Sequence, residues 1–385
     1  MRCRTGPRRH PLAVGLGAAL VLAWGCDGAP SGDEGDAPAP WALDPAPLVS
    51  LGVVDGAPEE VFSRIADVAL LSDGGVAVAD GSTATLRVFG PGGAFQGTMG
   101  GRGEGPGEFT RPGRVVALGA DTLLVYDSQA YRLTTFTRTG QLVATVPMLA
   151  ADGAPEVYLG RDGEGGHILA AIRPGPRDPS VVTPDLMDVA YYDAQGRRTR
   201  VAGTFPGMRR MGSPVPFSPH FLGGSVEGTV FVTDGLASRL TALSSAGPSD
   251  VALVRDPGTW ERDAAFLRLD SQMEPGPMKE MLDRVRDSGA WDSIPRYADL
   301  VPDPGGTIWL KRYDPGFDSH WVLRRRTGGA WDVVRPDGGY LATVSVPDGF
   351  RLMSVRGDRV AGVATDEMGV ERVLVFRLTR GAGSG

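Results

Sequence analysis

The chain has 385 residues, a formal net charge of −7, 42% hydrophobic residues, 56 glycines, 31 prolines and two cysteines. This composition excludes a disordered chain, a coiled coil and a disulfide scaffold, because apolar content is ordinary, glycine and proline are abundant and cysteine is nearly absent. A negative charge without a clustered basic face gives no basis for nucleic-acid binding, so no nucleic-acid partner is expected.

Residues 1–25 have the features of an export signal. Four arginines precede an almost wholly apolar run over residues 12–25. A basic region followed by an apolar stretch shorter than the roughly 20 residues of a membrane span is typical of a secretory signal. The segment ends in LAWGC, which resembles the lipobox of bacterial lipoproteins, and this resemblance implies cleavage before Cys26 and lipid attachment to it. An ordinary secretory signal cleaved nearby, which would leave Cys26 free, is the alternative.

The cysteine count supports a lipid anchor. Cys3 lies inside the signal, so Cys26 is the only cysteine of the mature chain and no internal disulfide is possible. The signal carries four arginines and no acid, so its removal takes the net charge to −11. Residues 26–47 are mostly Gly, Pro, Ala and acid and predict a flexible tether. We therefore expect an exported cell-envelope lipoprotein, facing the periplasm or the cell surface, whose membrane partner is reached through Cys26.

The body, residues 48–380, is predicted to be a β-strand repeat. Short runs rich in Val, Leu, Thr and aromatics alternate with Asp-Gly or Gly-Gly turns, which is typical of an all-β protein. The segments 76–89, 123–136 and 230–243 align without a gap. Each contains an apolar strand ending in aspartate, a polar loop and a second strand with leucine at the same position. A unit of roughly 40 to 50 residues with further strands on both sides predicts four-stranded propeller blades.

Six blades are expected, at residues 65–111, 112–153, 154–217, 218–256, 296–348 and 350–378. The last range supplies only three strands. Residues 48–54 are predicted to add the fourth strand and close the ring, which removes open sheet edges. Residues 381–385 are expected to form a flexible tail.

A helical insertion is predicted between blades four and five, at residues 257–296. Two groups of apolar residues there fall at helical spacing, with Pro277 in a first turn: Trp260, Ala264, Leu267, and then Met278, Met281, Leu282, Val285. We expect two short helices that pack over one face of the propeller.

The sequence GGRGEGPGEFTRP at residues 100–112, the VAD and VYD strand ends and the final DEMGVERVLVFRL resemble the six-bladed NHL-type propellers of bacterial exported proteins. The resemblance covers about residues 48–380. It implies an all-β, six-bladed β-propeller but no activity, because this architecture hosts unrelated functions.

The glycine-rich loop at residues 100–107 is a candidate ligand site, because successive backbone amides can cradle an anion. Arg102 and Glu104 lie in it and are kept as possible ligand-binding residues. No Lys-Ser or Lys-Thr pair ends the loop and no helix follows, as a phosphate-binding loop would require. The favoured alternative is a tight connection between blades, with Phe109 wedged between them.

Histidines provide a second candidate, since a zinc site in the channel could combine side chains from several blades, as in propeller-type lyases. The mature chain contains His167, His220 and His320, and only His220, just before an inner strand, is well placed for the channel. We expect three separate histidines, each at the surface or hydrogen-bonded, and no metal. Hydrolase-type propellers that hold a central cation characteristically use asparagine there, and this chain contains none.

The aspartates that end the aligned strands, Asp80, Asp127 and Asp234, are expected to cap turns or to pair with Arg132 and Arg239. No serine-hydrolase elbow and no dinucleotide fingerprint occurs in the sequence. The Arg-Gly-Asp tripeptide at 356–358 is interpreted as a turn between strands.

The sequence thus predicts a monomeric, membrane-anchored binding or scaffold module without a cofactor or an identifiable catalytic residue. Its ligand would be an unknown protein, peptide or carbohydrate. The alternative is a propeller-type hydrolase or lyase that uses a metal or an acidic site in the central channel.

Overall fold

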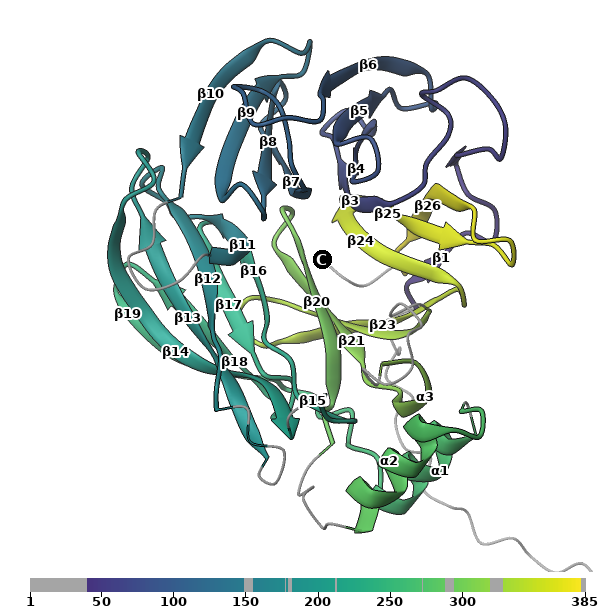
Figure 1. The fold of residues 1–385 in the computed structure, drawn as a ribbon. Helices are drawn as coiled ribbons and strands as arrows, with labels where there is room; N and C mark the ends of the chain where they lie inside the picture. Colours follow the sequence, from purple (N-terminus) through teal and green to yellow (C-terminus); the bar gives the residue numbers. More distant parts are fainter. Residues whose placement is uncertain are drawn as a thin grey trace, which may run out of the picture. The chain divides into compact units, whose positions relative to one another are not determined.

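The computed structural model describes residues 40–148, 155–176, 178, 182–211, 213–271, 273–287, 294–318 and 328–381. The predicted signal, Cys26 and most of the predicted tether lie outside these residues, as do His320 and most of the predicted C-terminal tail. The described chain forms six antiparallel sheets arranged as a ring (Figure 1). The predicted six-bladed propeller is therefore confirmed. None of the helices in the described part has the length and apolarity that a membrane crossing requires.

In each of the first three blades, the strands succeed one another in chain order from the innermost to the outermost. Blade one contains β3 (Ile65–Leu70), β4 (Val76–Asp80), β5 (Thr85–Phe89) and β6 (Phe95–Gly100). Blade two contains β7 (Pro112–Leu118), β8 (Thr122–Asp127), β9 (Arg132–Thr137) and β10 (Leu142–Pro147). Blade three contains β11 (Pro155–Arg161), β12 (His167–Arg173), β13 (Thr183–Tyr192) and β14 (Arg198–Met211), with the short β15 (Ser213–Pro214) beside β14.

The last three blades repeat this order. Blade four contains β16 (Leu222–Val226), β17 (Thr229–Thr233), β18 (Arg239–Ser244) and β19 (Gly247–Ala252). Blade five contains β20 (Tyr297–Asp303), β21 (Thr307–Arg312), β22 (Gly329–Val334) and β23 (Tyr340–Val346). Blade six contains β24 (Phe350–Arg356), β25 (Arg359–Thr365) and β26 (Glu371–Thr379) from the C-terminal part of the chain.

Each pair of neighbouring blades shares a hydrophobic core. Successive side chains of a strand point to opposite faces of its sheet, so one strand serves two cores. In β4, Val76 and Val78 pack in the core shared with blade six, whereas Ala77 and Ala79 pack in the core shared with blade two. All five residues of β4 are consequently buried. This explains why the middle strands are continuous apolar runs and not alternating ones.

The ring is closed by strands from the opposite end of the chain. β2 (Val49–Leu51) pairs antiparallel with β26, as the sequence predicts for residues 48–54. β1 (Ala42–Leu43) also pairs with β26, further along the same edge. The predicted tether boundary at residue 47 is therefore too late, because Trp41 is only 5% exposed and packs in the core between blades five and six.

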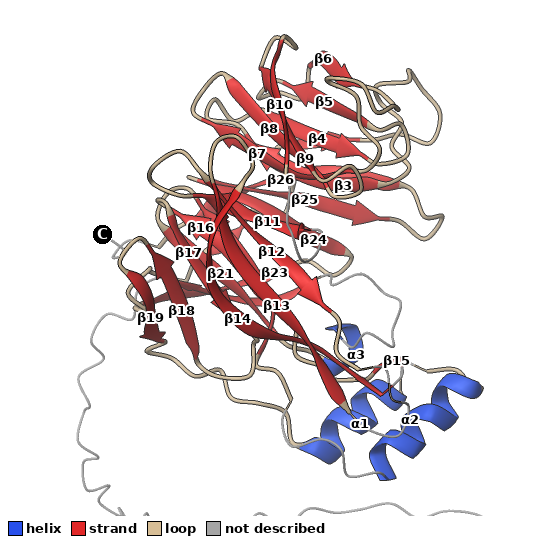
Figure 2. Cartoon of the chain, turned by 60° about the vertical axis from the view of Figure 1, so that its left-hand side comes forward, coloured by secondary structure: helices blue, strands red, loops and turns tan. Residues whose placement is uncertain are grey.

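The insertion between β19 and β20 contains the two predicted helices, α1 (Arg262–Asp270) and α2 (Pro277–Asp287), which lie side by side at one end of the molecule (Figure 2). The buried face of α1 differs from the predicted one. Phe266 packs edge-on against Phe217 at a centroid distance of 5.0 Å, whereas Leu267 is 70% exposed. The reason is that α1 begins at Arg262 and docks on the segment before blade four. A further short helix, α3 (Pro315–Asp318), follows β21.

The position of Trp41 predicts a large contribution to stability. Its ring lies 6.5 Å from that of Trp309, and the Arg380 guanidinium lies 4.7 Å from its centroid. Truncation of a buried tryptophan leaves a cavity, so Trp41→Ala should lower the free energy of unfolding by about 3 to 5 kcal/mol. Urea unfolding measures this. Val54→Ala, at a position that is 61% exposed, is the control and should change it by less than about 0.5 kcal/mol. Equal effects of the two substitutions would contradict a stabilising role of Trp41 in the core between blades five and six.

Candidate functional site

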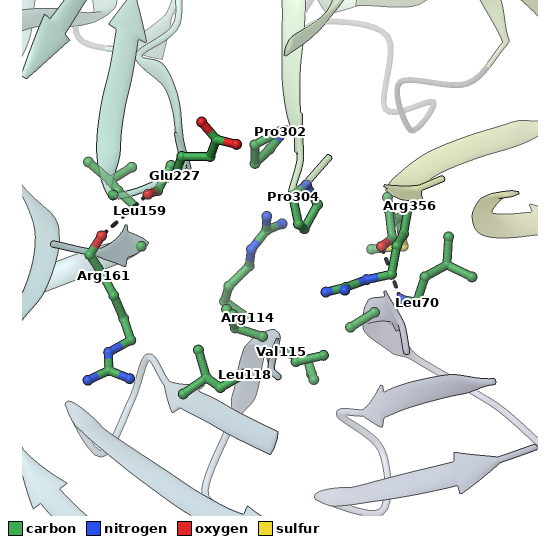
Figure 3. A pocket seen from close by; sticks show the side chains of 18 of the residues that line it. Leu70, Arg114, Val115, Leu118, Leu159, Arg161, Glu227, Pro302, Pro304 and Arg356 are labelled. Atoms are coloured by element: carbon green, nitrogen blue, oxygen red, sulfur yellow. Dashed lines mark hydrogen bonds between the residues drawn. The ribbon is translucent and has the colours of Figure 1, made fainter. Parts of the chain in front are cut away.

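The innermost strands of all six blades surround a central channel. Where these strands end and turn into hairpins, a cavity of about 400 Å³ opens, which we call the hairpin mouth (Figure 3). Each blade contributes residues near the end of its inner strand, among them Leu70, Leu118, Arg161, Ser225, Pro302 and Arg356. A second cavity of about 370 Å³, the entry mouth, lies where the strands begin and includes Asp67, Tyr158 and Asp299. Arg114 and Met353 line both cavities and so lie between them.

The wall of the hairpin mouth is largely apolar. Val68, Leu70, Val115 and Leu159 line it and are at most 4% exposed, because each also belongs to a core between blades. These side chains are fixed by strands and their packing and do not depend on mobile loops. A concave wall that is mostly apolar, with a few convergent polar groups, is typical of small-molecule sites, which have volumes of about 300 to 1,000 Å³.

Two arginines project into the hairpin mouth. Figure 3 shows Arg114 in the middle of the opening and Arg356 extending toward it from the end of β24. Arg114 Nε lies 3.8 Å from Asp67 Oδ2, and the Arg114 side chain is 36% exposed. Asp67 also accepts the backbone N–H of Val115 at 2.8 Å. Burial raises the pKa of Asp67 above its usual range, with the nearby Arg114 charge acting in the opposite direction.

Three further charged residues line the same cavity. Arg161 Nη2 donates to the Gly165 carbonyl at 2.9 Å. Asp162 Oδ1 accepts two backbone N–H groups of its own turn, so its carboxylate is already engaged. Glu227 lies in the β16–β17 hairpin with φ +49°, a conformation that is unfavourable for any residue except glycine. Figure 3 shows its carboxylate on the side of Pro302.

Arg102 and Glu104, predicted as possible ligand-binding residues, lie outside both mouths. Arg102 donates to the Ser82 carbonyl at 2.8 Å, and Arg132 donates to the Glu104 carbonyl at 2.6 Å. Phe109 is fully buried and packs edge-on against Phe136 in the core between blades one and two. The glycine-rich loop thus has the geometry of the favoured alternative, a connection between blades wedged by Phe109.

The histidines of the described part line neither mouth. His167 is buried, with Nδ1 3.2 Å from Tyr158 Oη. His220, the predicted channel histidine, has Nδ1 2.7 Å from the Ser218 carbonyl. His320 lies outside the described residues. Across the residues that the structure describes, no three His, Cys, Asp or Glu side chains are grouped as a metal site would require.

The aligned aspartates cap turns, which is the first of their two expected roles, whereas Arg132 and Arg239 have other partners. Asp127 accepts backbone N–H groups on both sides of its strand, from Thr110 at 2.6 Å and Ala130 at 2.9 Å. Arg132 instead donates to carbonyls of the glycine-rich loop, since that loop crosses its position. Arg239 lies 3.9 Å from Asp250 on the neighbouring outer strand.

The other two aspartates behave similarly. Asp80 accepts the N–H of Ser82 at 2.8 Å and pairs with Arg87 at 3.1 Å, a partner that the alignment did not suggest. Asp234 accepts the N–H of Leu236 at 3.0 Å. All three carboxylates therefore shape turns at the ends of second strands.

Comparisons with known proteins support the fold. No protein-family model and no curated protein sequence matches the chain. A Bacteroides fragilis structure described as a predicted exported protein matches with TM-score 0.50 and 10% identity, covering 89% of this chain and 97% of that one. A member of the DUF4221 family from Bacteroides vulgatus matches with TM-score 0.52 and 8% identity over 89% and 99%. Virginiamycin B lyase from Staphylococcus aureus matches with TM-score 0.43 and 7% identity over 87% and 99%. At these identities the first two likenesses support the fold alone, and the third, with a TM-score below 0.5, carries no argument.

The buried His167 predicts a defined pH dependence of stability. Burial, assisted by the Arg161 charge and opposed by Asp162, lowers the pKa of His167 to about 4, whereas an unfolded histidine titrates near 6.5. The unfolded chain therefore binds more protons between these values. The stabilising contribution is fully present above about pH 6.5 and is lost as the pH falls through about 4, by at most about 1.4 kcal/mol per pH unit.

Urea unfolding of the protein and of His167→Gln, at about pH 7 and about pH 4.5, measures this contribution. The unsubstituted protein should lose more stability between the two pH values than the variant does. Equal losses would show that His167 is not the titrating group.

Proposed function

We propose that the protein is an exported, membrane-anchored binding module whose central channel receives a small ligand at the hairpin mouth. The observation that carries this proposal is the cavity of about 400 Å³ to which all six blades contribute. Its walls are inner strands held by cores on both sides, so the site is formed before any ligand arrives. A preformed site avoids the entropic cost of ordering loops on binding.

The anchor part of the proposal rests on the sequence of the N-terminal segment. The four arginines, the apolar run and the LAWGC ending support export and lipid attachment at Cys26. The described propeller begins by Trp41, which leaves the preceding residues to connect it to the membrane. One structural neighbour is itself described as a predicted exported protein, which is the location proposed here.

Cys26→Ser tests the anchor. Loss of the acylation site should move the protein from the membrane fraction to the soluble fraction of the cell, measured by fractionation and immunoblotting. An unchanged membrane association of Cys26→Ser would contradict a lipid anchor at this position. A Cys3→Ser substitution, inside the predicted signal, is the matched control and should leave the fractionation unchanged.

A bulky residue at the rim tests the channel as the binding site. Gly163 lines the hairpin mouth, and a Cβ atom added there has no atom within 4 Å, so Gly163→Phe should be accommodated and obstruct the opening. Gly97 on the outer strand β6 has equally open surroundings and lines none of the four cavities described, so Gly97→Phe is the control.

The purified proteins would be incubated with a small-molecule extract of the cell envelope, washed and measured by mass spectrometry. Gly163→Phe should lose the retained material and Gly97→Phe should keep it. Equal retention by Gly163→Phe and the unsubstituted protein would show that the ligand does not occupy this mouth.

The second candidate function is a propeller-type hydrolase or lyase. The observation that favours it is Asp67, a buried carboxyl with a raised pKa that lines the entry mouth beside Arg114. Perturbed carboxyls in cavities are candidates for acid–base chemistry. A metal-dependent form of this alternative requires one tightly held zinc or calcium ion per chain, which elemental analysis of the Cys26→Ser protein would detect.

A further inference from the structure

The charges in the hairpin mouth have the opposite bias to the protein as a whole. The chain carries a net charge of −7, yet three of the five charged side chains that line this cavity are arginines. Asp162 is one of the two acids, and its carboxylate is held by two backbone N–H groups of its own turn. A concave, apolar-walled opening with an excess of positive charge concentrates the field at its centre and attracts anions.

Arg114 is held in a way that leaves its donors available. Its Nε faces the buried Asp67 carboxylate at 3.8 Å, which orients the guanidinium group. No described residue accepts a hydrogen bond from either terminal nitrogen of Arg114 (Figure 3). These two nitrogens form the planar fork that binds a carboxylate or phosphate in a bidentate manner.

Arg356 supplies a second cation from another blade. It ends β24 in blade six, whereas Arg114 lies on β7 in blade two, and the two side chains enter the same cavity. Within the described ranges, Arg356 has no hydrogen-bond or ion-pair partner through its side chain, and Figure 3 shows it extending toward Arg114. Both arginines have unused donors and converge on one partly desolvated site. Because both are positively charged they repel each other, and an anion bound between them would offset this repulsion.

Apolar side chains complete the recognition surface. Leu70, Val115, Leu118 and Leu159 line the same cavity as the two arginines and offer contact to a hydrocarbon body. Glu227 lies on the Pro302 side and limits how far a negative ligand can extend in that direction, since like charges repel (Figure 3). The site therefore combines one cationic side with an apolar wall.

We propose that the hairpin mouth binds a small organic anion, with its carboxylate or phosphate group on Arg114 and Arg356 and its apolar body against the inner strands. This inference rests on the proposed channel-binding function and names the ligand class for it. Carboxylate and phosphate ligands of this class share a compact anionic group attached to a hydrocarbon part.

Calorimetric titration with three probes tests the ligand class. The probes are 4-phenylbutyrate, its neutral isostere 4-phenylbutanamide, and phenyl phosphate. An anionic probe should bind at least about tenfold more tightly than the amide, because hydrogen bonds to charged groups contribute strongly in partly buried sites. Stronger binding of 4-phenylbutyrate would identify a carboxylate source of the anion, and stronger binding of phenyl phosphate a phosphate source.

Variants assign the effect to the two arginines. The double variant Arg114→Gln with Arg356→Gln should weaken binding of the preferred anion at least about tenfold and binding of the amide by less than about twofold. Arg239→Gln on β18 removes one positive charge, as Arg356→Gln does, but lies away from the mouth, and it should leave all three affinities unchanged. Because Arg114 also faces Asp67, the single variant Arg356→Gln is measured in parallel. It has no described partner to lose and must by itself weaken anion binding.

Equal affinities for an anion and the amide, or an unchanged anion affinity in Arg356→Gln, would overturn the anion inference. So would the absence of binding by all three probes. The broader binding function fails on a different result, namely retention of envelope material by Gly163→Phe, so the two failures can be distinguished.

Discussion

The pairing of β1 and β2 with β26 is the constraint on which the rest of the molecule depends. A blade buries its two faces only against its neighbours, so an open ring would leave two apolar faces and a sheet edge in water. Blade six takes three strands from the C-terminal part of the chain and its outer strands from the N-terminal part. Trp41 strengthens this closure by packing between blades five and six.

Closure also determines the geometry of the candidate site. Arg356 belongs to blade six and Arg114 to blade two, so their convergence requires blade six to be fixed against blade one. Buried acids help to hold this register. Glu371 of blade six accepts the N–H of Ile65 in blade one at 2.5 Å, and Asp67 of blade one accepts the N–H of Val115 in blade two at 2.8 Å. Each acid satisfies a backbone donor that would otherwise be buried without a partner.

The fold could be predicted from the sequence because its signals are local and repeated. The apolar runs that end in Asp80 and Asp127 predict the second strand of blades one and two. The turns on either side of these runs mark where the neighbouring strands begin and end. The closing strand at Val49–Leu51 could be predicted from the count of strands in the last blade. Trp41 could not, because it lies among alanines and prolines whose composition predicts a tether, and only its contact with Trp309 reveals its role.

The site was less predictable than the fold. Arg114 and Arg356 converge only when the six blades are arranged around the channel, and the strand pattern of a single blade does not show this arrangement. The most conspicuous motif, the glycine-rich loop, lines neither mouth, and it seats Phe109 between blades one and two, as the favoured interpretation of its sequence expected. An alignment of the six inner-strand ends by blade would have placed Arg161 and Arg356 at comparable positions and drawn attention to the mouth.

A single closed ring holds the channel in shape. Native-state hydrogen exchange of the amides in β26 tests it most directly, because these amides lie between β25 and the N-terminal strands. In a closed ring these amides should exchange only through global unfolding, with the same free energy of opening as the amides of β4 in blade one. Exchange of β26 at a much lower free energy of opening than β4 would show that the ring opens locally and does not hold the channel in shape.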